Sequence, residues 1–282
     1  MDISVIVPFY KGNCYMQQLF AIVAANAKQA KPAQVELLIV NDSPEQPVEY
    51  DPAWVEGFSL RILENETNMG IHGSRVNGIR HAHGTYIQML DQDDLLAENA
   101  LASQLAAIGD AQVCVANGID QAGKGAIYES PAHQQWATRP RFYYSLGNMI
   151  VSPGQCLLRR DAVPAFWMEQ IMTRNGSDDL LLWLLLFGEN ATWAVNPQSL
   201  YTHVFTGQNV SSDGLKMSAS SREVLEKLEQ NGKLTPKERR RFRRSRSLGR
   251  SLVGKGKAGK ALAMLCYPDV LIEKLILKRI KG

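Results

Sequence analysis

The sequence predicts an α/β protein with a mostly parallel β-sheet, flanking helices and a basic helical tail. Two observations predict the sheet: short β-branched runs alternate with helical patterns in the first third of the chain, and runs such as 37–40 are apolar throughout. A third observation predicts the tail. From Lys233 to the C-terminal residue, 16 Lys or Arg stand against three acidic residues, a net charge of +13, whereas residues 1–232 carry 15 basic and 25 acidic side chains, or −10.

The first third of the chain contains the regular elements. Strands are expected at 3–7, 35–40, 60–63 and 86–90, with helices at 15–28 and 71–83. In such sheets ligands bind beyond the carboxyl ends of the strands. The candidate binding residues are therefore those that follow the strands: Pro8 to Tyr10, Asn41 to Ser43 and Asp91 to Asp94.

From about Val113 the pattern becomes mixed, which is more typical of a substrate-binding half than of regular winding. A strand is expected at 155–158, a helix near 162–172, and a second helix that starts at Asp178 and Asp179 with Ser177 as its N-cap. Small and polar residues between 206 and 221 predict a loop or hinge. These features divide the chain into a nucleotide-sugar-binding half (1–112), an acceptor-binding half (113–212) and the basic extension (213–282).

Several classes of protein are disfavoured by simple counts. The four cysteines, at 14, 114, 156 and 266, are too sparse for a disulfide framework and form no C-x-x-C zinc pair. The longest apolar run, 180–187, is well short of the ~20 residues that cross a bilayer. The first residues resemble a buried strand more than a signal peptide. We therefore expect a cytoplasmic protein with reduced thiols, and its acidic body argues against a uniformly basic nucleic-acid binder.

Three carboxylates at Asp91, Asp93 and Asp94 stand at the end of an apolar strand. Clustered acids repel one another beside a buried sheet unless a cation is present, and Mg²⁺ or Mn²⁺ is the natural partner, held by one or two carboxylates, water and substrate phosphate. On this spacing alone, an acidic loop that caps a helix beginning near Ala97 is the simpler interpretation.

The residues before this cluster decide between the two interpretations. They resemble the pattern of the family 2 glycosyltransferases of the GT-A fold at many fixed offsets. The matching positions are Asn68, Gly70, Arg75, Gly78, Ile79, Ala82, Gly84, Tyr86, Asp91, Asp93 and Asp94. Segments 5–10 and 40–43, the pair Asp178-Asp179 and the Tyr201-x-His203 sequence extend the resemblance over roughly residues 3 to 211. It implies a GT-A fold, which is Rossmann-like, and inverting transfer of a sugar from a nucleoside diphosphate.

The resemblance implies a nucleotide site at the ends of the first strands. Pro8, Tyr10 and Asp42 match positions that line the base, where a carboxylate can accept the N3–H of uracil or thymine. Arg75 matches an arginine that supports the base and phosphates, with a surface helix charge as its alternative interpretation. Gln92 is likewise assigned to nucleotide binding.

The same resemblance implies roles for the acidic cluster. Asp91 corresponds to the acid that contacts the ribose, Asp93 to the direct ligand of Mn²⁺ or Mg²⁺, and Asp94 to support of the loop or acceptor side. His203 matches a further contact to the metal or diphosphate. The bound ion would stabilise the charge that develops as the nucleoside diphosphate leaves.

The acceptor side needs a base, because a sugar hydroxyl that attacks an anomeric carbon must lose its proton. Asp179 matches the catalytic base of these enzymes and Asp178 an acid that binds or orients the acceptor. Trp183, in the apolar helix that follows, could line the floor of the acceptor pocket.

The sequence departs from the family pattern in three places. The second strand ends in Asn41-Asp42-Ser43-Pro44 in place of the commoner Asp-Asp-Gly-Ser, so the first acid is missing while Asp42 is retained. Val76 replaces the usual Asn. The Gly-Phe-Asp stretch that usually precedes the acidic pair is not recognisable between 163 and 177, which predicts an unusual acceptor pocket.

The basic tail combines an arginine-rich stretch at 239–246 with aliphatic residues among lysines at 270–280. Cationic heads on aliphatic bodies suit an anionic membrane surface, where each Lys or Arg contributes about 1 kcal/mol. This predicts a peripheral protein at the cytosolic face of the inner membrane. The charges of 270–280 are dispersed around a helix, so packing on the catalytic domain, or on a second subunit in a homodimer, is the alternative. Nucleic-acid binding is disfavoured because aromatic residues are few.

Together these features predict a metal-dependent inverting glycosyltransferase. It would pass a sugar from a UDP- or dTDP-linked donor to a hydroxyl of a lipid-linked or cell-surface glycan. Two alternatives remain. The acceptor could be polyprenyl phosphate, which is already anionic and needs a base less, or the chain could be an inactive nucleotide-binding scaffold. The intact acids at 91, 93, 94 and 179 favour an active enzyme.

Overall fold

The computed structural model describes residues 2–122, 125–207, 209, 212–252 and 255–281. The chain divides into two compact units. The first, which we call the sheet unit, comprises residues 1–127, 150–163 and 191–206, and the second, the helical unit, comprises 128–149, 164–190 and 207–282. Among the described residues, no helix combines the length and the apolar character needed to cross a membrane. All four cysteines are free thiols.

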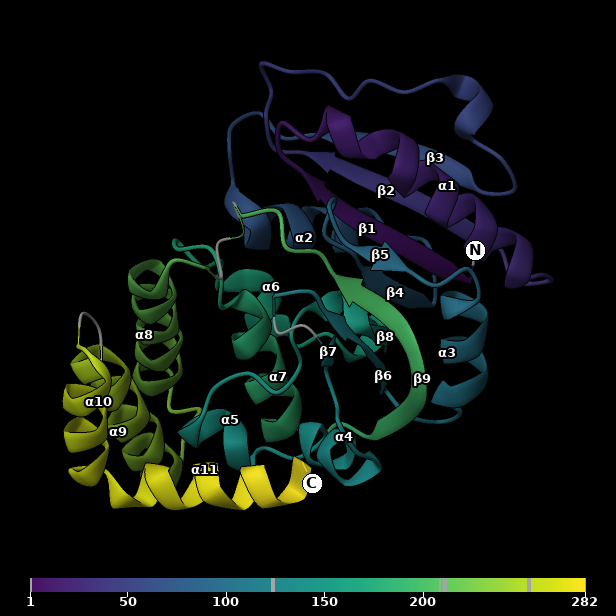
Figure 1. The fold of residues 1–282 in the computed structure, drawn as a ribbon. Helices are drawn as coiled ribbons and strands as arrows, with labels where there is room; N and C mark the ends of the chain where they lie inside the picture. The colour runs from purple at the N-terminus through teal and green to yellow at the C-terminus, as the bar shows by residue number, and fades with distance from the viewer. Residues whose placement is uncertain (1, 123–124, 208, 210–211, 253–254, 282) are drawn as a thin grey trace. The chain divides into compact units, whose positions relative to one another are not determined.

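The sheet unit is built on one mixed sheet with the strand order β3-β2-β1-β4-β8-β6-β9-β5, and β7 pairs with β6 (Figure 1). Its strands are β1 (Ile3–Phe9), β2 (Val35–Asn41), β3 (Ser59–Glu64), β4 (Tyr86–Met89), β5 (Leu95–Leu96), β6 (Val113–Asp120), β7 (Gly125–Ala126), β8 (Cys156–Arg159) and β9 (Trp193–His203). Strands β3, β2, β1 and β4 are parallel, as are β6 and β9, whereas β8 runs antiparallel to β4 and β6. The carboxyl ends of β1, β2 and β4 therefore meet at one edge, where the predicted site residues follow.

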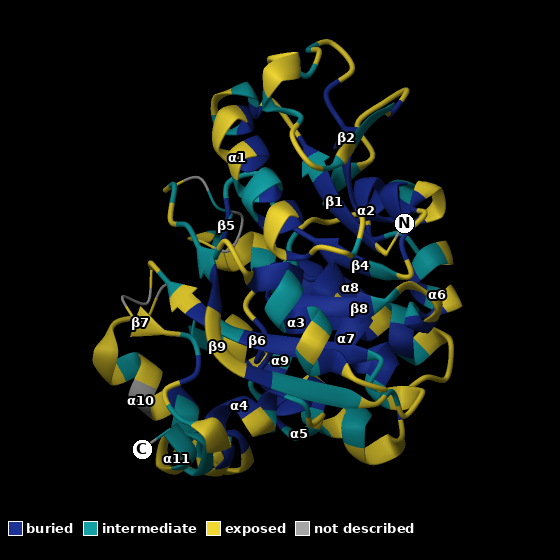
Figure 2. Ribbon diagram, turned by 90° about the vertical axis from the view of Figure 1, so that its right-hand side faces the viewer, coloured by how far each residue is buried: buried dark blue, intermediate teal, exposed yellow. Residues whose placement is uncertain are grey.

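Helices cover both faces of this sheet. On one face, Val5 and Val7 of β1 join the buried cluster that contains Met16 and Phe20 of α1 (Asn13–Gln29) and residues of α3 (Ala100–Ile108). On the other face, α2 (Gly70–His81) comes so close that a Cβ at Gly78 would lie 2.3 Å from Cγ2 of Ile6. The strands between these helices are buried along most of their length (Figure 2). This two-sided burial explains why the strands are continuously apolar.

The predicted elements of the first third are confirmed, with small shifts at their ends, and four later predictions differ from the structure. The expected helix at 162–172 is a 3₁₀ turn, η3 (Arg160–Ala162), followed by extended residues and the short α6 (Ala165–Glu169), because Pro164 disfavours a helical conformation at Val163. The helix expected near Ala97 begins at Ala100.

Two further differences concern helix starts in the helical unit. Ser177 occupies the N-cap position of α7 (Asp178–Gly188), but its side chain makes no capping hydrogen bond and its hydroxyl contacts that of Ser221 at 3.3 Å. The loop expected over 206–221 is shorter, because α8 (Gly214–Gln230) already starts at Gly214. Asp213 caps α8 by accepting hydrogen bonds from the main-chain N–H groups of Leu215 and Lys216.

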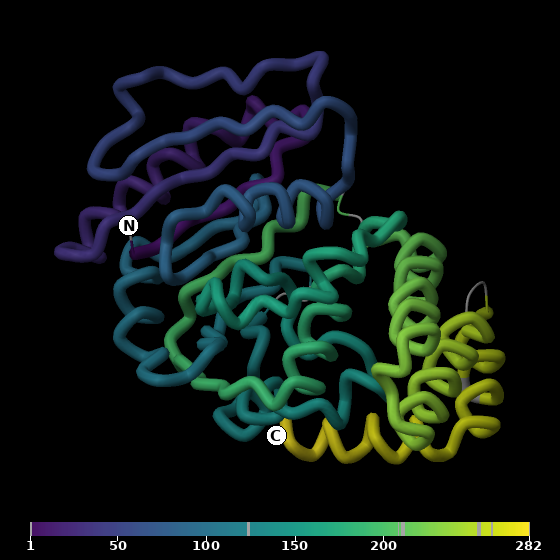
Figure 3. The backbone as a smooth tube through the Cα atoms, turned by 180° about the vertical axis from the view of Figure 1, so that it is seen from behind, coloured from purple at the N-terminus to yellow at the C-terminus, as the bar shows by residue number. Residues whose placement is uncertain are grey.

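The helical unit contains the basic tail as an integral part. Its other helices are α4 (Pro131–Ala137), α5 (Arg141–Ser145), α9 (Pro236–Leu252), α10 (Lys257–Leu265) and α11 (Pro268–Lys281). Helices α8 and α9 lie side by side, and α11 runs against α4 and α5 (Figure 3). The Arg141 guanidinium donates to the Glu273 carboxylate at 2.8 Å, and Ser130 Oγ donates to the Ile280 carbonyl at 2.9 Å. The tail thus packs on the preceding chain, which was the alternative to a detached appendage.

The aromatic segment of α5 contributes to this packing. Phe142, Tyr143 and Tyr144 are buried, and the ring of Tyr144 lies 6.4 Å from that of the fully buried Phe242 in α9. These rings therefore form core, while Trp136 of α4 remains half-buried with its ring 5.2 Å from that of Phe142.

Candidate functional site

Asp42, directly after β2, organises the entry into α2. Its Oδ1 accepts hydrogen bonds from Asn65 Nδ2 at 2.8 Å and Met69 N at 2.6 Å, and its Oδ2 accepts one from Gly70 N at 2.8 Å. Gly70 has a φ of 75°, a left-handed conformation that suits glycine. A carboxylate oxygen accepts about two hydrogen bonds. Within the described part of the chain, Oδ2 therefore keeps one acceptor position for a donor such as an imide N–H.

Asn41 stands where the family pattern more often has an acid, and its amide is fully used. Its Nδ2 donates to Glu64 Oε2 at 2.7 Å and to the Gln46 carbonyl at 2.9 Å, while its Oδ1 accepts from Ser43 N at 3.0 Å. An aspartate would lack both donors and would place a second charge beside Glu64. The departure from the family pattern therefore has a local structural cause.

Gln92 clamps the segment that follows β1. Its Oε1 accepts from Tyr10 N at 3.0 Å, and its Nε2 donates to the Tyr10 carbonyl at 3.2 Å. Gly12 is required beside this clamp, because a Cβ there would lie 2.2 Å from Gln92 Oε1. The Tyr10 ring is half exposed, and Pro8 is half-buried in β1 opposite Val40. The structure thus brings together Pro8, Tyr10 and Gln92, with the Tyr10 ring half exposed and the Lys11 ammonium 5.3 Å from its centre.

Arg75 is a buried helix residue, not a surface charge. Its side chain is almost entirely covered, and its Nη2 donates to Asp91 Oδ1 at 2.5 Å. Ser152 Oγ donates to the other carboxylate oxygen of Asp91 at 3.3 Å. About a third of the Asp91 side chain remains exposed, so this carboxylate is held by the protein and still reachable by a ligand.

Asp93 lies next to Asp91 in the acidic cluster and is partly buried. Burial and the neighbouring charge of Asp91 raise its pKa, and the charge of His203 opposes this shift. His203 Nδ1 lies 3.2 Å from Asp120 Oδ1, and this contact fixes the orientation of the imidazole ring. The described residues contain no group of three or more His, Cys, Asp or Glu side chains that could hold a metal. Asp93 and His203 fit an ion that substrate phosphates and water complete.

Asp94 faces away from this exposed edge and holds the end of β9. It accepts hydrogen bonds from the Tyr201 hydroxyl and from Val204 N, the latter at 2.9 Å. Burial and the charge of Asp91 raise the pKa of Asp94 well above its usual range. Because Asp94 is buried and both of its oxygens are engaged, it stabilises the loop next to His203.

The remaining predicted residues belong to the helical unit. Asp179 opens α7, and its Oδ2 accepts a hydrogen bond from Asn148 Nδ2 at 2.6 Å while Leu180 N donates to its Oδ1 at 2.7 Å. The carbonyl of Asp178 accepts from Trp167 Nε1 at 2.8 Å. Trp183 is fully buried in α7, so it can affect an acceptor only through the side chains above it. Hydrogen bonds from Asn148, Leu180 and Trp167 thus fix the first residues of α7.

Sequence reasoning missed the amide side chains that hold these acids. Asn65 follows β3 at the same edge of the sheet as Asp42, so the rule that ligands and site residues gather at the carboxyl ends of parallel strands could have found it. Asn148 lies in an irregular segment with no motif around it, and only the fold shows its contact with Asp179.

Comparisons with known proteins agree with this geometry. Residues 4–167, more than half of the chain, match the family described as Glycosyl transferase family 2. The minor teichoic acid biosynthesis protein GgaB of Bacillus subtilis is 30% identical over 106 residues, which are 37% of this chain and 12% of GgaB. WfgD of Escherichia coli, named as a UDP-Glc:alpha-D-GlcNAc-diphosphoundecaprenol beta-1,3-glucosyltransferase, is 27% identical over 103 residues, 36% of this chain and 39% of WfgD. The matches thus span well under half of these relatives.

Solved structures show the same fold. The crystal structure of residues 1–349 of Staphylococcus aureus TarS superposes with a TM-score of 0.61 at 20% identity, covering 90% of this chain and 76% of that one. The mannosyltransferase PcManGT from Pyrobaculum calidifontis, in complex with GDP-Man and Mn²⁺, gives a TM-score of 0.54 at 14% identity, covering 99% of this chain and 84% of that one. The expected GT-A fold is confirmed. With a family match over most of the sheet unit, the chain belongs to glycosyl transferase family 2.

Proposed function

We propose that the protein transfers a sugar, with inversion, from a nucleoside diphosphate donor to a hydroxyl of a lipid-linked or cell-surface glycan. The observation that carries this proposal is the arrangement of Asp42, Arg75, Asp91 and Asp93 behind β2 and β4. It combines an acceptor for a base N–H, a buried cation and partly exposed carboxylates at one edge of the sheet. Such an edge is where parallel sheets bind nucleotides.

The donor nucleotide would be UDP or dTDP, because both carry a base with an N3–H. Oδ2 of Asp42 has room for one more donor, and the N3–H of uracil or thymine supplies it. Structures of TarS, which share this fold, contain UDP and UDP-GlcNAc, and this supports the same donor class here. Arg75 would hold Asp91 in place for the ribose, and the Tyr10 ring would cover the base.

Asp93 and His203 would hold Mn²⁺ or Mg²⁺. When bound, the ion supplies positive charge to the leaving diphosphate. Burial and the charge of Asp91 raise the pKa of Asp93, and a bound cation would oppose both effects. The contact between His203 and Asp120 keeps the histidine oriented for this role.

Asp179 would act as the general base. It takes the proton of the acceptor hydroxyl as the hydroxyl oxygen forms a bond to the anomeric carbon. The bond from that carbon to the diphosphate oxygen breaks with its electron pair, and the nucleoside diphosphate leaves. A single displacement inverts the anomeric centre. Asn148 holds the carboxylate of Asp179, and Asp178 at the same helix start would orient the acceptor.

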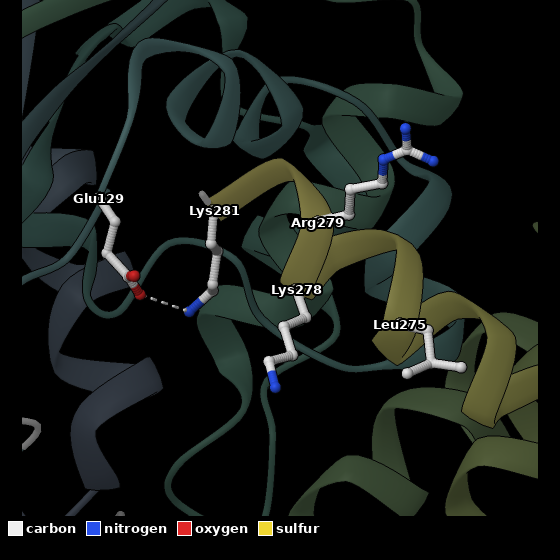
Figure 4. A pocket seen from close by; sticks show the side chains of 5 residues that line it. All are labelled: Glu129, Leu275, Lys278, Arg279 and Lys281. Carbon is white, nitrogen blue, oxygen red and sulfur yellow. Dashed lines mark hydrogen bonds and ion pairs between the residues drawn. The ribbon is translucent and has the colours of Figure 1, made fainter.

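A relative's acceptor and the surface of the helical unit support a lipid-linked acceptor and a location at the membrane surface. The acceptor named for WfgD is lipid-linked, which supports a lipid-linked or polysaccharide acceptor here. The helical unit exposes the apolar side chains of Leu262, Leu265, Ile272 and Leu275 on α10 and α11. A pocket of about 560 Å³ beside Leu275 is lined by Glu129, Lys278, Arg279 and Lys281. Figure 4 shows Lys281 directed at Glu129, 3.3 Å away, while Lys278 and Arg279 extend elsewhere. This combination suits the anionic cytosolic face of the inner membrane.

A thermal-shift screen of UDP-, dTDP- and GDP-sugars with and without Mn²⁺ tests the donor proposal. A UDP-sugar should raise the melting temperature when Mn²⁺ is present. Asp93→Asn should lose this shift, and Glu98→Gln, an exposed acid in the same segment, should keep it. The donor proposal is wrong when no nucleotide sugar shifts the wild type with Mn²⁺ present.

Co-sedimentation with anionic liposomes tests the membrane proposal. Because α9 to α11 are packed within the helical unit, point variants are preferable to deletion of the tail. The double variant Lys278→Gln/Arg279→Gln should bind several-fold more weakly than the wild type. Arg222→Gln, an exposed arginine on α8, is the matched control and should bind as the wild type does. Equal liposome binding by the wild type and both variants would show that Lys278 and Arg279 of α11 do not contact the membrane.

A further inference from the structure

A second pocket lies within the helical unit, between the C-terminal end of α5 and helices α7, α8, α9 and α11. Its volume is about 340 Å³. Its polar lining consists of hydroxyl groups, one amide and two cations, and no Asp or Glu side chain of the described residues lines it. The side chains that matter are Asn148, Ser177, Ser221, Ser245, Arg246 and Lys274. A concave site with donors and no carboxylates is suited to an anion.

Arg246 of α9 is the most unusual of these side chains. Its Nε is fully buried and has no hydrogen-bond partner among the described residues. Its Nη2 donates to the hydroxyl of Ser245 at 3.1 Å, and the guanidinium lies 5.1 Å from the centre of the Phe242 ring. Burial lowers the pKa of Arg246 to about 10, so the group stays charged at neutral pH. A buried guanidinium without a carboxylate is costly unless an anion compensates it.

Lys274 of α11 adds a second positive charge to the same pocket. Over the described ranges, no carboxylate lies within ion-pair distance of Lys274 or Arg246. Two other cations of α9 are closely paired: Arg243 bonds Glu229 at 2.6 Å, and Arg244 bonds Asp269 at 2.6 Å. Arg246 and Lys274, by contrast, line the pocket without a carboxylate partner among the described residues.

One residue that lines the pocket, Asn148, is hydrogen-bonded to Asp179, the carboxylate that we propose as the base. Asn148 lines the pocket and donates to Asp179 Oδ2 at 2.6 Å. Ser177, which also lines it, directly precedes the acidic pair. An anion held by Arg246 and Lys274 would thus sit close to the acceptor end of the reaction.

We propose that this pocket binds a phosphate or diphosphate group of the acceptor. A guanidinium fork, an ammonium group and several hydroxyls match an oxyanion with many acceptor oxygens better than they match a single carboxylate. The volume also leaves room for the group to which the phosphate is attached. Binding of the anion stands on the pocket alone, and its assignment to the acceptor rests on the proposed function.

Calorimetric titration of the full-length protein with inorganic pyrophosphate, in the presence of EDTA, tests the pocket. Arg246→Met and Lys274→Met should each weaken binding about tenfold or more, because each removes a charge-assisted contact. The matched controls Arg250→Met and Lys257→Met remove exposed cations from α9 and α10 and should bind as the wild type does. If Arg246→Met fails to fold, Lys274→Met and Arg246→Lys replace it, and both should weaken pyrophosphate binding.

The outcomes separate this inference from the proposed function. The proposed anion site is wrong if the wild type does not bind pyrophosphate. It is also wrong if the two pocket variants and the two control variants all bind pyrophosphate as tightly as the wild type. Loss of binding to phosphatidylglycerol vesicles in Lys274→Met, without any binding of pyrophosphate, would assign the cations to a membrane headgroup and also overturn it. Pyrophosphate binding that depends on Lys274, in a protein whose melting temperature no nucleotide sugar shifts, would retain the anion site and reject the proposed function.

Discussion

Nη2 of Arg75 donates a 2.5 Å hydrogen bond to Oδ1 of Asp91, and this contact joins α2 to the acidic segment behind β4. Arg75 is almost fully covered, whereas Asp91 is about one-third exposed. The guanidinium therefore pairs with one of the three clustered carboxylates from the buried side of Asp91. The exposed part of the Asp91 carboxylate stays available to a ligand. This contact gives one of the three neighbouring carboxylates a cationic partner, which reduces the repulsion within the cluster.

Replacement of Arg75 by Met should weaken donor binding and destabilise the sheet unit. The buried pair would lose its cation, and Asp91 would then repel the diphosphate and the neighbouring carboxylates. Because Asp91 is partly exposed to water, we expect a stability loss of about 1–3 kcal/mol, smaller than for a fully buried pair. Urea unfolding measures the stability, and a UDP-sugar titration with Mn²⁺ measures the affinity.

The matched control for this substitution is Arg80→Met, on the same helix but exposed. It should retain both the stability and the donor affinity of the wild type. Donor affinity of Arg75→Met equal to that of Arg80→Met would show that the contact between Arg75 and Asp91 serves folding only.

The sheet and its edge could be predicted from the sequence because local patterns determine them. The apolar run 37–40 marks a strand buried on both faces, and the residues behind it, such as Asp42, fall at the binding edge by a general rule. The path after residue 113 was harder to predict, because contacts distant in sequence fix it. Asn148 meets Asp179 across 31 positions, and Arg246 lines a pocket formed by five separate segments. No local spacing encodes such contacts.

Asp179→Asn should abolish sugar transfer and leave donor binding unchanged. Asparagine keeps the shape of the side chain but cannot take a proton from the acceptor, so kcat should fall by about 10²–10⁴-fold. Asn148→Ala removes the hydrogen bond that orients the carboxylate, and we expect a smaller loss of kcat, about tenfold, with an unchanged donor KM. Steady-state kinetics on the acceptor and donor separate the two effects.

Glu189→Gln provides the control for both variants of the helical unit, since Glu189 follows the same helix and is exposed. Its rate should equal that of the wild type. Full activity of Asp179→Asn would show that Asp179 is not the general base. A change of donor KM without a change of kcat in Asn148→Ala would show that Asn148 does not position the base.

Asn41→Asp restores the more common family residue and should nevertheless destabilise the protein. The substitution removes the donors to Glu64 and to the Gln46 carbonyl and sets two carboxylates side by side. We expect a loss of about 1–3 kcal/mol in the free energy of unfolding. The double variant Asn41→Asp/Glu64→Gln should recover part of this loss, because the glutamine amide can donate to the new carboxylate. Equal stability of the two variants would reject the explanation.

Glu36 of β2 should make the stability of the sheet unit depend on pH. Its side chain is fully buried. Burial raises its pKa, but hydrogen bonds from Ser4 Oγ at 2.5 Å and His83 N at 2.6 Å, with the charges of His83 and Arg61, outweigh burial and lower the pKa below its ordinary value of 4.5. The native state therefore releases this proton more readily than the unfolded state. Its contribution is present above the unfolded pKa and is lost as the pH falls through the folded pKa.

Glu36→Gln should accordingly be less stable than the wild type at neutral pH, by about 1–3 kcal/mol. The glutamine keeps the shape and an acceptor for Ser4 and His83, but it loses the negative charge near Arg61, whose Nη1 lies 3.6 Å from Oε2 of Glu36. The difference should narrow as the pH falls from 4.5 through the lower pKa of the folded state, because the unfolded chain binds this proton first. Urea unfolding at a series of pH values measures it, with the exposed Glu66→Gln as control. A difference between Glu36→Gln and the wild type that stays constant across the series would mean that packing, and not the charge of Glu36, sets the loss.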